Sequence, residues 1–325
     1  MDAPDEQPWL LLIHQLPPKP SYLRVKVWRR LQSLGAVAIK NSVYVLPSND
    51  QTREDFEWVL REIVKEGGEA SMCEARFVEG LRDEQIEMLF HGARDADYAQ
   101  LAEEVRELAE NLPGGRSRVP ESERAAFELT LARYKRRLAE IVEIDFFSSS
   151  GREVASGLLA GVEARLGLGS SKGAELPAAR IKDLQRRVWV TRKGVHIDRI
   201  ASAWLIRRFI DPHAQLKFVA GKGYEPARGE VRFDMFDAEF THEGDLCTFE
   251  VLLSRLGIED PALRPIAEIV HDIDLKDGKF RQAAAPGIDR LIAGIAMGHA
   301  QDEERVARGS AVFEDLYEYF RRKRS

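Results

Sequence analysis

The order of apolar runs in the first 80 residues most constrains the fold of this chain. Trp9 to Ile13 is a short apolar run typical of a buried strand, and the proline-rich segment 17–20 prevents it from continuing as a helix. The pattern predicts strand, helix, strand, strand, helix and strand at residues 9–13, 21–34, 36–39, 43–46, 50–66 and 72–78. This βαββαβ order predicts a ferredoxin-like domain over residues 1–80.

The rest of the chain predicts three further parts, so the expected fold class is α+β. Residues 81–147 carry two charge-rich helical stretches around Pro113-Gly114-Gly115, a pattern that favours a helical hairpin. The hairpin either packs on its own domain or mediates the formation of a homodimer. Residues 148–179 are rich in Gly and Ser at both ends, which predicts a linker. Residues 180–325 predict a mixed α/β domain that is mainly helical, with strands near 188–191, 216–219 and 231–236.

Composition and charge exclude several classes of protein. Lys+Arg 48 against Asp+Glu 54 gives a net charge of −6, so binding to nucleic acid requires a local basic patch. The two cysteines form no CxxC pair, which suits a reducing compartment. The apolar run at 9–13 is far shorter than a membrane span, and the acidic segment before it is unlike a signal peptide. We therefore expect a cytoplasmic protein that does not contact the membrane.

Histidine and carboxylate side chains gather in the second half, where they offer ligands for a metal. Glu268 and His271 are spaced i, i+3 and share one helical face with Asp274. Imidazole with carboxylates suits a divalent Zn, Fe or Mn ion. The residues expected to form this site are His196, Glu239, His242, Glu250, His271 and Asp274. Alternatively, such pairs arise by chance in a chain with 31% charged residues, and Asp198 is a helix cap.

A basic stretch on the first predicted helix offers contacts for DNA. Lys26, Arg29 and Arg30 lie opposite or beside the apolar stripe, with no acidic residue among them. Cations placed in this way on a helix are typical of contacts to phosphate groups. The alternative interpretation is an ordinary solvated helix face.

A second basic stretch leads into the start of a helix near Gly194. A small oxyanion requires positive charge and several hydrogen-bond donors. This position brings together guanidinium groups, an ammonium group and exposed backbone N–H groups. We expect Arg187, Arg192 and Lys193 to supply the positive charge. The alternative is that these residues form ordinary ion pairs with neighbouring carboxylates.

Five segments together resemble one known family. They are WVTRKGVHIDRIASAW at 189–204, FDAEFTHEG at 236–244, HDIDLK at 271–276, WLLLIH at 9–14 and NSVYVLP at 41–47. These segments resemble the bacterial ChrB chromate-resistance family, and the resemblance covers both halves of the chain. It implies a regulator that senses chromate and controls transcription of a chromate-efflux operon. Its partners would be chromate and promoter DNA. The resemblance does not assign the residues that bind chromate; Arg187, Arg192 and Lys193 are expected to do so on their charge alone.

An enzyme is the alternative function. The sequence contains no GxxxxGK[ST] loop, no strand-linked GxGxxG and no GxSxG elbow, so nucleotide-dependent and serine-hydrolase chemistry lose their main support. The histidine and carboxylate cluster instead favours a metal-dependent oxidoreductase or an oxyanion reductase.

Overall fold

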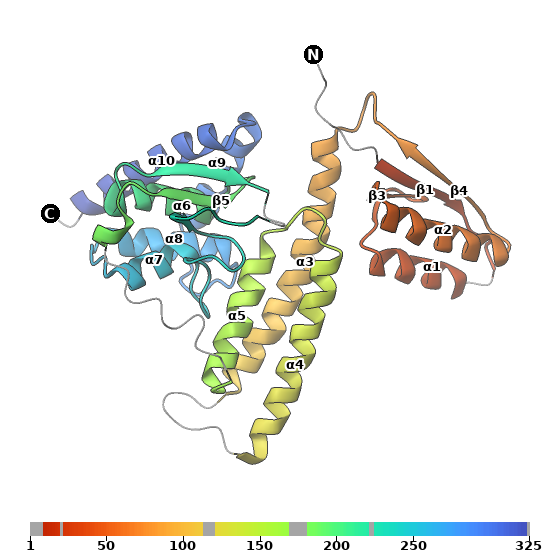
Figure 1. Cartoon of the computed structure of the whole chain (residues 1–325), viewed down its shortest axis with the longest axis horizontal. Coiled ribbons are helices and arrows are strands. Elements are labelled where there is room, and N and C mark those ends of the chain that lie inside the picture. The colour runs from red at the N-terminus through yellow and green to blue at the C-terminus, as the bar shows by residue number, and fades with distance from the viewer. Residues whose placement is uncertain (1–8, 20–21, 113–120, 169–180, 221–223, 324–325) are drawn as a thin grey trace. The chain divides into compact units, whose positions relative to one another are not determined.

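The computed structural model describes residues 9–19, 22–112, 121–168, 181–220 and 224–323 (Figure 1). The chain divides into two compact units. The N-terminal unit comprises residues 1–100 and 136–151, and the C-terminal unit comprises residues 101–135 and 152–325. The mixed α+β class predicted from the sequence is confirmed.

The N-terminal unit contains the predicted ferredoxin-like layout. Its four strands pair in the order β2-β3-β1-β4, and every neighbouring pair is antiparallel. Helices α1 and α2 lie side by side on one face of this sheet (Figure 1). The elements are β1 (Trp9–Gln15), α1 (Tyr22–Ser33), β2 (Val37–Lys40), β3 (Val43–Pro47), α2 (Asp50–Lys65) and β4 (Glu69–Ala75).

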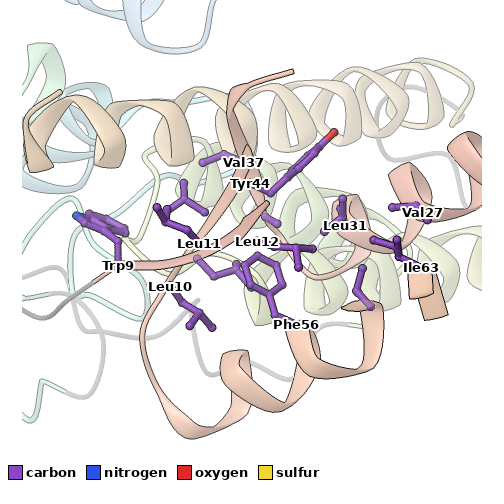
Figure 2. Packing of buried hydrophobic residues seen from close by; sticks show 14 of the residues in the cluster. Trp9, Leu10, Leu11, Leu12, Val27, Leu31, Val37, Tyr44, Phe56 and Ile63 are labelled. Atoms are coloured by element: carbon purple, nitrogen blue, oxygen red, sulfur yellow. The ribbon is translucent and has the colours of Figure 1, made fainter. Parts of the chain in front are cut away.

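The core of this unit follows from the alternation of side chains along β1. Leu10 and Leu12 point to the face that α1 and α2 cover, where they share a cluster with Phe56 of α2 (Figure 2). Trp9 and Leu11 point to the opposite face, and the Trp9 ring stacks on Phe90 with ring centroids 6.0 Å apart. Apolar layers on both faces therefore fix the register of the central strand.

Three long helices follow the sheet: α3 (Asp83–Glu110), α4 (Glu121–Glu143) and α5 (Gly151–Arg165). The helices α3 and α4 occupy the region of the predicted hairpin, and each contributes residues to both units. The predicted turn at 113–115 lies outside the described residues.

The prediction of a linker over 148–179 is wrong for residues 151–165, which form α5. Val154, Leu158 and Val162 recur every four residues along α5 and are buried, so packing decides the structure of a segment whose flanks are rich in Gly and Ser. Residues 169–179 of the predicted linker lie outside the described residues.

The C-terminal unit is built on a small parallel sheet in the order β6-β5-β7. Strand β7 is shorter than predicted, because Asp234 adopts a left-handed backbone conformation with φ of 46° and turns the chain. After Thr248, the described residues form only helices and their connections, as predicted. The elements are a 3-10 turn (Ile181–Leu184), β5 (Val188–Arg192), α6 (Ile197–Leu205) continued by a π-helical turn (Ile206–Ile210), β6 (Gln215–Val219), β7 (Glu230–Arg232), α7 (Thr248–Leu256), α8 (Leu263–Asp274), α9 (Ala285–Gly298) and α10 (Asp302–Arg322).

None of the helices in the described part of the chain combines the length and apolar character that crossing a membrane requires.

Candidate functional site

The candidate site lies at the carboxyl ends of the strands of the C-terminal sheet. Strand β5 is central, its connection through α6 leads to β6 on one side, and the chain then crosses to β7 on the other side. Such a change of direction creates a switch point where open α/β sheets bind their ligands. Arg192 is the last residue of β5, and Asp234 follows β7 by two residues. Both side chains enter the buried cluster described next.

Two ion pairs form one half of this cluster. Arg192 lies 2.8 Å from Glu153 of α5, and the two side chains are 6% and 2% exposed. Arg199 of α6 lies 3.1 Å from Asp234, with side chains 8% and 7% exposed. Removing ions from water is costly, so the two opposite charges within each buried pair must compensate each other.

His242 and three carboxylates form the other half. The Nε2 atom of His242 lies 2.8 Å from Asp274 and 3.9 Å from Asp198, and its Nδ1 atom lies 3.5 Å from Asp234. Burial acts to lower the pKa of His242, but the hydrogen bond to Asp274 and the negative charges of the three carboxylates raise it to about 10.

Asp198 joins this cluster because it caps a helix other than its own. Its carboxylate accepts hydrogen bonds from the backbone N–H groups of Thr248 and Phe249, at 2.7 and 3.0 Å, where α7 begins. The Thr248 hydroxyl donates to Asp234 at 2.9 Å. Burial and the nearby negative charges of Asp234 and Asp274 raise the pKa of Asp198 well above its ordinary value. The start of α7 therefore holds two carboxylates in place.

Two glycines of α5 let the loop that carries His242 approach closely. A Cβ atom at Gly157 would lie 2.9 Å from the Cβ atom of His242, and one at Gly161 would lie 2.8 Å from the Cα atom of Gly244. The Gly157 carbonyl also accepts a hydrogen bond from the Gly244 N–H at 3.2 Å. These glycines explain how Glu153, one turn earlier on α5, comes to face the same cluster.

The structure divides the six predicted metal-ligating residues among four places. His242 and Asp274 lie together in the cluster. Glu250 and His271 form a second pair at 2.7 Å, and Asp277 contacts the other ring nitrogen of His271 at 3.2 Å.

Glu239 belongs to neither group. His196 is not among the grouped ligands, although the lowering of its pKa by partial burial is opposed in part by the charge of Asp274, one of those ligands. Glu239 pairs with Arg232 at 3.0 Å, and His196 is an exposed residue at the start of α6. One metal site built from all six predicted residues is therefore wrong.

Sequence reasoning missed three members of the cluster: Glu153, Arg199 and Asp234. An acidic residue directly after a buried strand was a usable signal for Asp234, because strand ends of this kind meet at one edge of a parallel sheet. Glu153 gave no such signal, since it lies in the segment interpreted as a linker. Asp198 was interpreted as a cap, which it is, although for α7 and not for α6.

The three residues predicted to bind an oxyanion do not share one place. Arg192 lies in the buried cluster, and Lys193 is exposed. Arg187 precedes β5, where its guanidinium donates to the Asp183 carbonyl at 3.0 Å. Five residue steps along a strand separate Arg187 from Arg192 by about 16 Å, too far for one small anion.

Two backbone donors that come just before α6 already have a partner. The N–H groups of Gly194 and Val195 donate to the carboxylate of Asp302 at 2.9 and 3.0 Å. These two N–H groups are therefore not open to an anion, whereas an anion site at the N–H groups of α6 itself stays a prediction.

Of the residues predicted to contact DNA, two are available on the surface of α1. Lys26 lies 2.7 Å from Glu62 and 3.6 Å from Glu66, so acidic neighbours already compensate its charge. Arg29 and Arg30 are exposed, and neither has an ion-pair partner within the part of the chain that the structure describes.

Comparison with known proteins identifies the family. The model of the ChrB N-terminal domain matches residues 24–169, and the model of the ChrB C-terminal domain matches residues 189–320. The chain is 30% identical over 322 residues to Protein ChrB of Cupriavidus metallidurans, an alignment that covers 97% of this chain and 96% of that protein. No solved structure matches this chain. The chain belongs to the ChrB family and is thus a chromate-resistance-related protein.

Proposed function

We propose that this protein is a chromate-responsive, DNA-binding regulator of transcription of a chromate-efflux operon. In this proposal the outer face of α1 contacts promoter DNA, and the buried cluster of the C-terminal unit senses chromate. Membership of the ChrB family supports the link to chromate, and the surface of α1 supports the link to DNA.

The observation that carries the proposal is a group of arginines without acidic partners on α1. Arg24, Arg29 and Arg30 are all exposed, and no ion pair compensates them among the described residues. Trp28 on the same helix is 53% exposed. Exposed guanidinium groups beside an aromatic ring suit contacts to phosphate and sugar, and in a protein of net charge −6 such a surface is a local exception.

The sensing role rests on the cations that meet in the cluster. Arg192, Arg199 and His242 all act on the charges of Glu153 and Asp234. Chromate is a dianion at neutral pH and needs several charge-assisted donors. We propose that chromate competes with one of these carboxylates for the arginines, which makes Arg192 the member of the predicted set that senses it.

The DNA contact is tested by fluorescence anisotropy with promoter DNA over a range of salt concentrations. We expect Arg29→Ala/Arg30→Ala to weaken binding and to reduce the slope of log K against log salt by about 1.8, since each lost phosphate contact contributes about 0.9. A matched control, Arg321→Ala/Arg322→Ala on α10, changes the net charge equally and should keep the slope. Equal slopes in the α1 variant and the unmodified protein would refute the contact.

The chromate response is tested by adding chromate, or sulfate as a control oxyanion, to the preformed DNA complex. We expect chromate to release the unmodified protein, and Arg192→Met to bind DNA without being released. Arg187→Met is the control, because Arg187 lies at the opposite end of β5. Normal release of Arg192→Met together with loss of release in Arg187→Met would place the sensor at Arg187.

A metal-dependent oxidoreductase or oxyanion reductase is the second candidate. The observation in its favour is that His242 and two carboxylates offer three ligand atoms, which would leave coordination positions for a substrate. Such an enzyme would consume chromate in proportion to an added reductant, whereas a regulator would bind chromate without consuming it.

A further inference from the structure

Three side chains of the cluster converge in the manner of metal ligands. Asp198, His242 and Asp274 each offer one ligand atom, and these atoms lie within 4.8 Å of one another. The Nε2 atom of His242 is 2.8 Å from Asp274 and 3.9 Å from Asp198. Ligands at about 2.1 Å from a shared ion lie about 3 to 3.5 Å apart, so small movements suffice to close this group on an ion.

We propose that Asp198, His242 and Asp274 bind a divalent first-row transition-metal ion such as Zn²⁺ or Mn²⁺. One imidazole and two carboxylates form a ligand set of the kind these ions take. The set differs from the one predicted by sequence spacing, with which it shares only His242 and Asp274.

The second ring nitrogen of His242 supports the proposal independently. Nδ1 is buried without a hydrogen-bond partner among the described residues, in a side chain that is 3% exposed, and it faces the Asp234 carboxylate at 3.5 Å. Arg199 and Thr248 hold Asp234 in that position. A histidine that binds a metal through one nitrogen typically directs the other N–H to a carboxylate, and Asp234 is placed for this role.

Charge balance points to a divalent ion. Arg192 pairs with Glu153, and Arg199 pairs with Asp234, which leaves Asp198 and Asp274, among the described residues, as the carboxylates of the cluster that belong to neither arginine pair. Uncompensated charges are costly in a buried site. An ion of charge +2 matches the combined charge of these two carboxylates when both are ionised.

The proposal is tested on the full-length chain after treatment with a chelator and exchange into metal-free buffer. Isothermal titration with Zn²⁺, and separately with Mn²⁺, should show one ion bound per chain. We expect Asp274→Asn to lose this binding; Asp274 is the most exposed of the three ligands, at 18%, so its replacement disturbs the fold least. Circular dichroism checks that the variant is folded.

Glu239→Gln is the matched control, because Glu239 also belonged to the predicted set but pairs with Arg232 away from the cluster. It should bind as the unmodified chain does. Substituting Co²⁺ adds a second readout, since its visible absorption reports nitrogen and oxygen ligation and should disappear in Asp274→Asn. Unchanged affinity in Asp274→Asn, or no binding by the unmodified chain, would overturn the proposal.

These measurements need neither DNA nor chromate, so they separate this inference from the proposed function. If the protein binds one ion at this site but never responds to chromate, the metal site is supported and the regulatory function is refuted. If the protein responds to chromate but its Asp274→Asn variant binds Zn²⁺ normally, the regulatory function is supported and the metal site is refuted.

Discussion

Removing one partner of the buried pair between Arg192 and Glu153 should have very unequal effects. The two groups lie 2.8 Å apart and are almost fully buried. Breaking a pair of this kind costs about 3–5 kcal/mol when it leaves a charge without compensation. We expect Glu153→Met to cost up to an amount in this range, because it removes the carboxylate that pairs with Arg192 and the guanidinium cannot release its proton.

Arg192→Met should cost less, because the remaining carboxyl group can become neutral. Burial raises the pKa of Glu153 above its ordinary value of 4.5, against the opposing effect of the Arg192 and Arg199 charges. Removing Arg192 raises this pKa further. Protonating a carboxyl group costs about 1.4 kcal/mol for each unit by which the pH exceeds its pKa. A raised pKa therefore reduces the loss of stability when Glu153 becomes neutral in Arg192→Met.

The same reasoning fixes the sign of the pH dependence. In Arg192→Met the folded chain holds a proton on Glu153 that the unfolded chain releases near its ordinary pKa. The folded variant then binds more protons than the folded unmodified chain, so its relative stability falls as the pH rises from the already raised pKa of Glu153 in the unmodified chain toward the higher pKa in the variant. Glu153→Met contains no such carboxyl, so its cost relative to the unmodified chain should change with pH only where Glu153 of the unmodified chain itself titrates.

Urea unfolding of both single variants and of Arg192→Met/Glu153→Met at pH 5 and pH 8 checks this prediction. The double variant should be more stable than Glu153→Met, because replacing a buried pair with apolar side chains is often neutral or stabilising. The coupling energy of the cycle then measures the interaction. Equal costs for the single variants at both pH values, with a double variant that equals their sum, would refute the reasoning.

Two further predictions concern packing. Gly309→Ala should destabilise the chain by about 1–3 kcal/mol, because its Cβ atom would lie 2.3 Å from a methyl carbon of Ile200. Gly294→Ala should stabilise the chain by about 0.4–1 kcal/mol, because its Cβ atom would meet nothing within 4 Å. Thermal unfolding should shift in opposite directions for the two variants, and equal shifts would contradict the packing. Phe56→Ala should lower the free energy of unfolding by about 3–5 kcal/mol, because Phe56 is fully buried. Trp58 is 56% exposed, so Trp58→Ala should lower it by about 0.5 kcal/mol or less. Urea midpoints that changed equally in the two variants would disprove this contrast.

The sequence by itself determined the N-terminal fold well, because local hydrophobic patterns predict each of its helices and strands. The continuous apolar run over Trp9 to Ile13 and the helical recurrence of Leu23, Val27 and Leu31 are properties of neighbours along the chain. The same logic failed for α5. Its apolar stripe is as regular as that of α1, but Gly and Ser in the flanking segments dominated the interpretation, and only packing shows that the stripe is buried.

The candidate site was decided by the tertiary structure. The sequence supplied the residue types and located His242 and Asp274, yet the local spacing that suggested Glu268 and His271 as partners was misleading, since Glu268 pairs with Arg264 on the exposed side of α8. The actual partners are distant along the chain: Glu153 meets Arg192 across 39 residues. Periodicity places a side chain on a face of its own helix or strand, whereas the carboxylates and cations of the cluster meet only because α5, the ends of β5 and β7, and the start of α7 pack around one point.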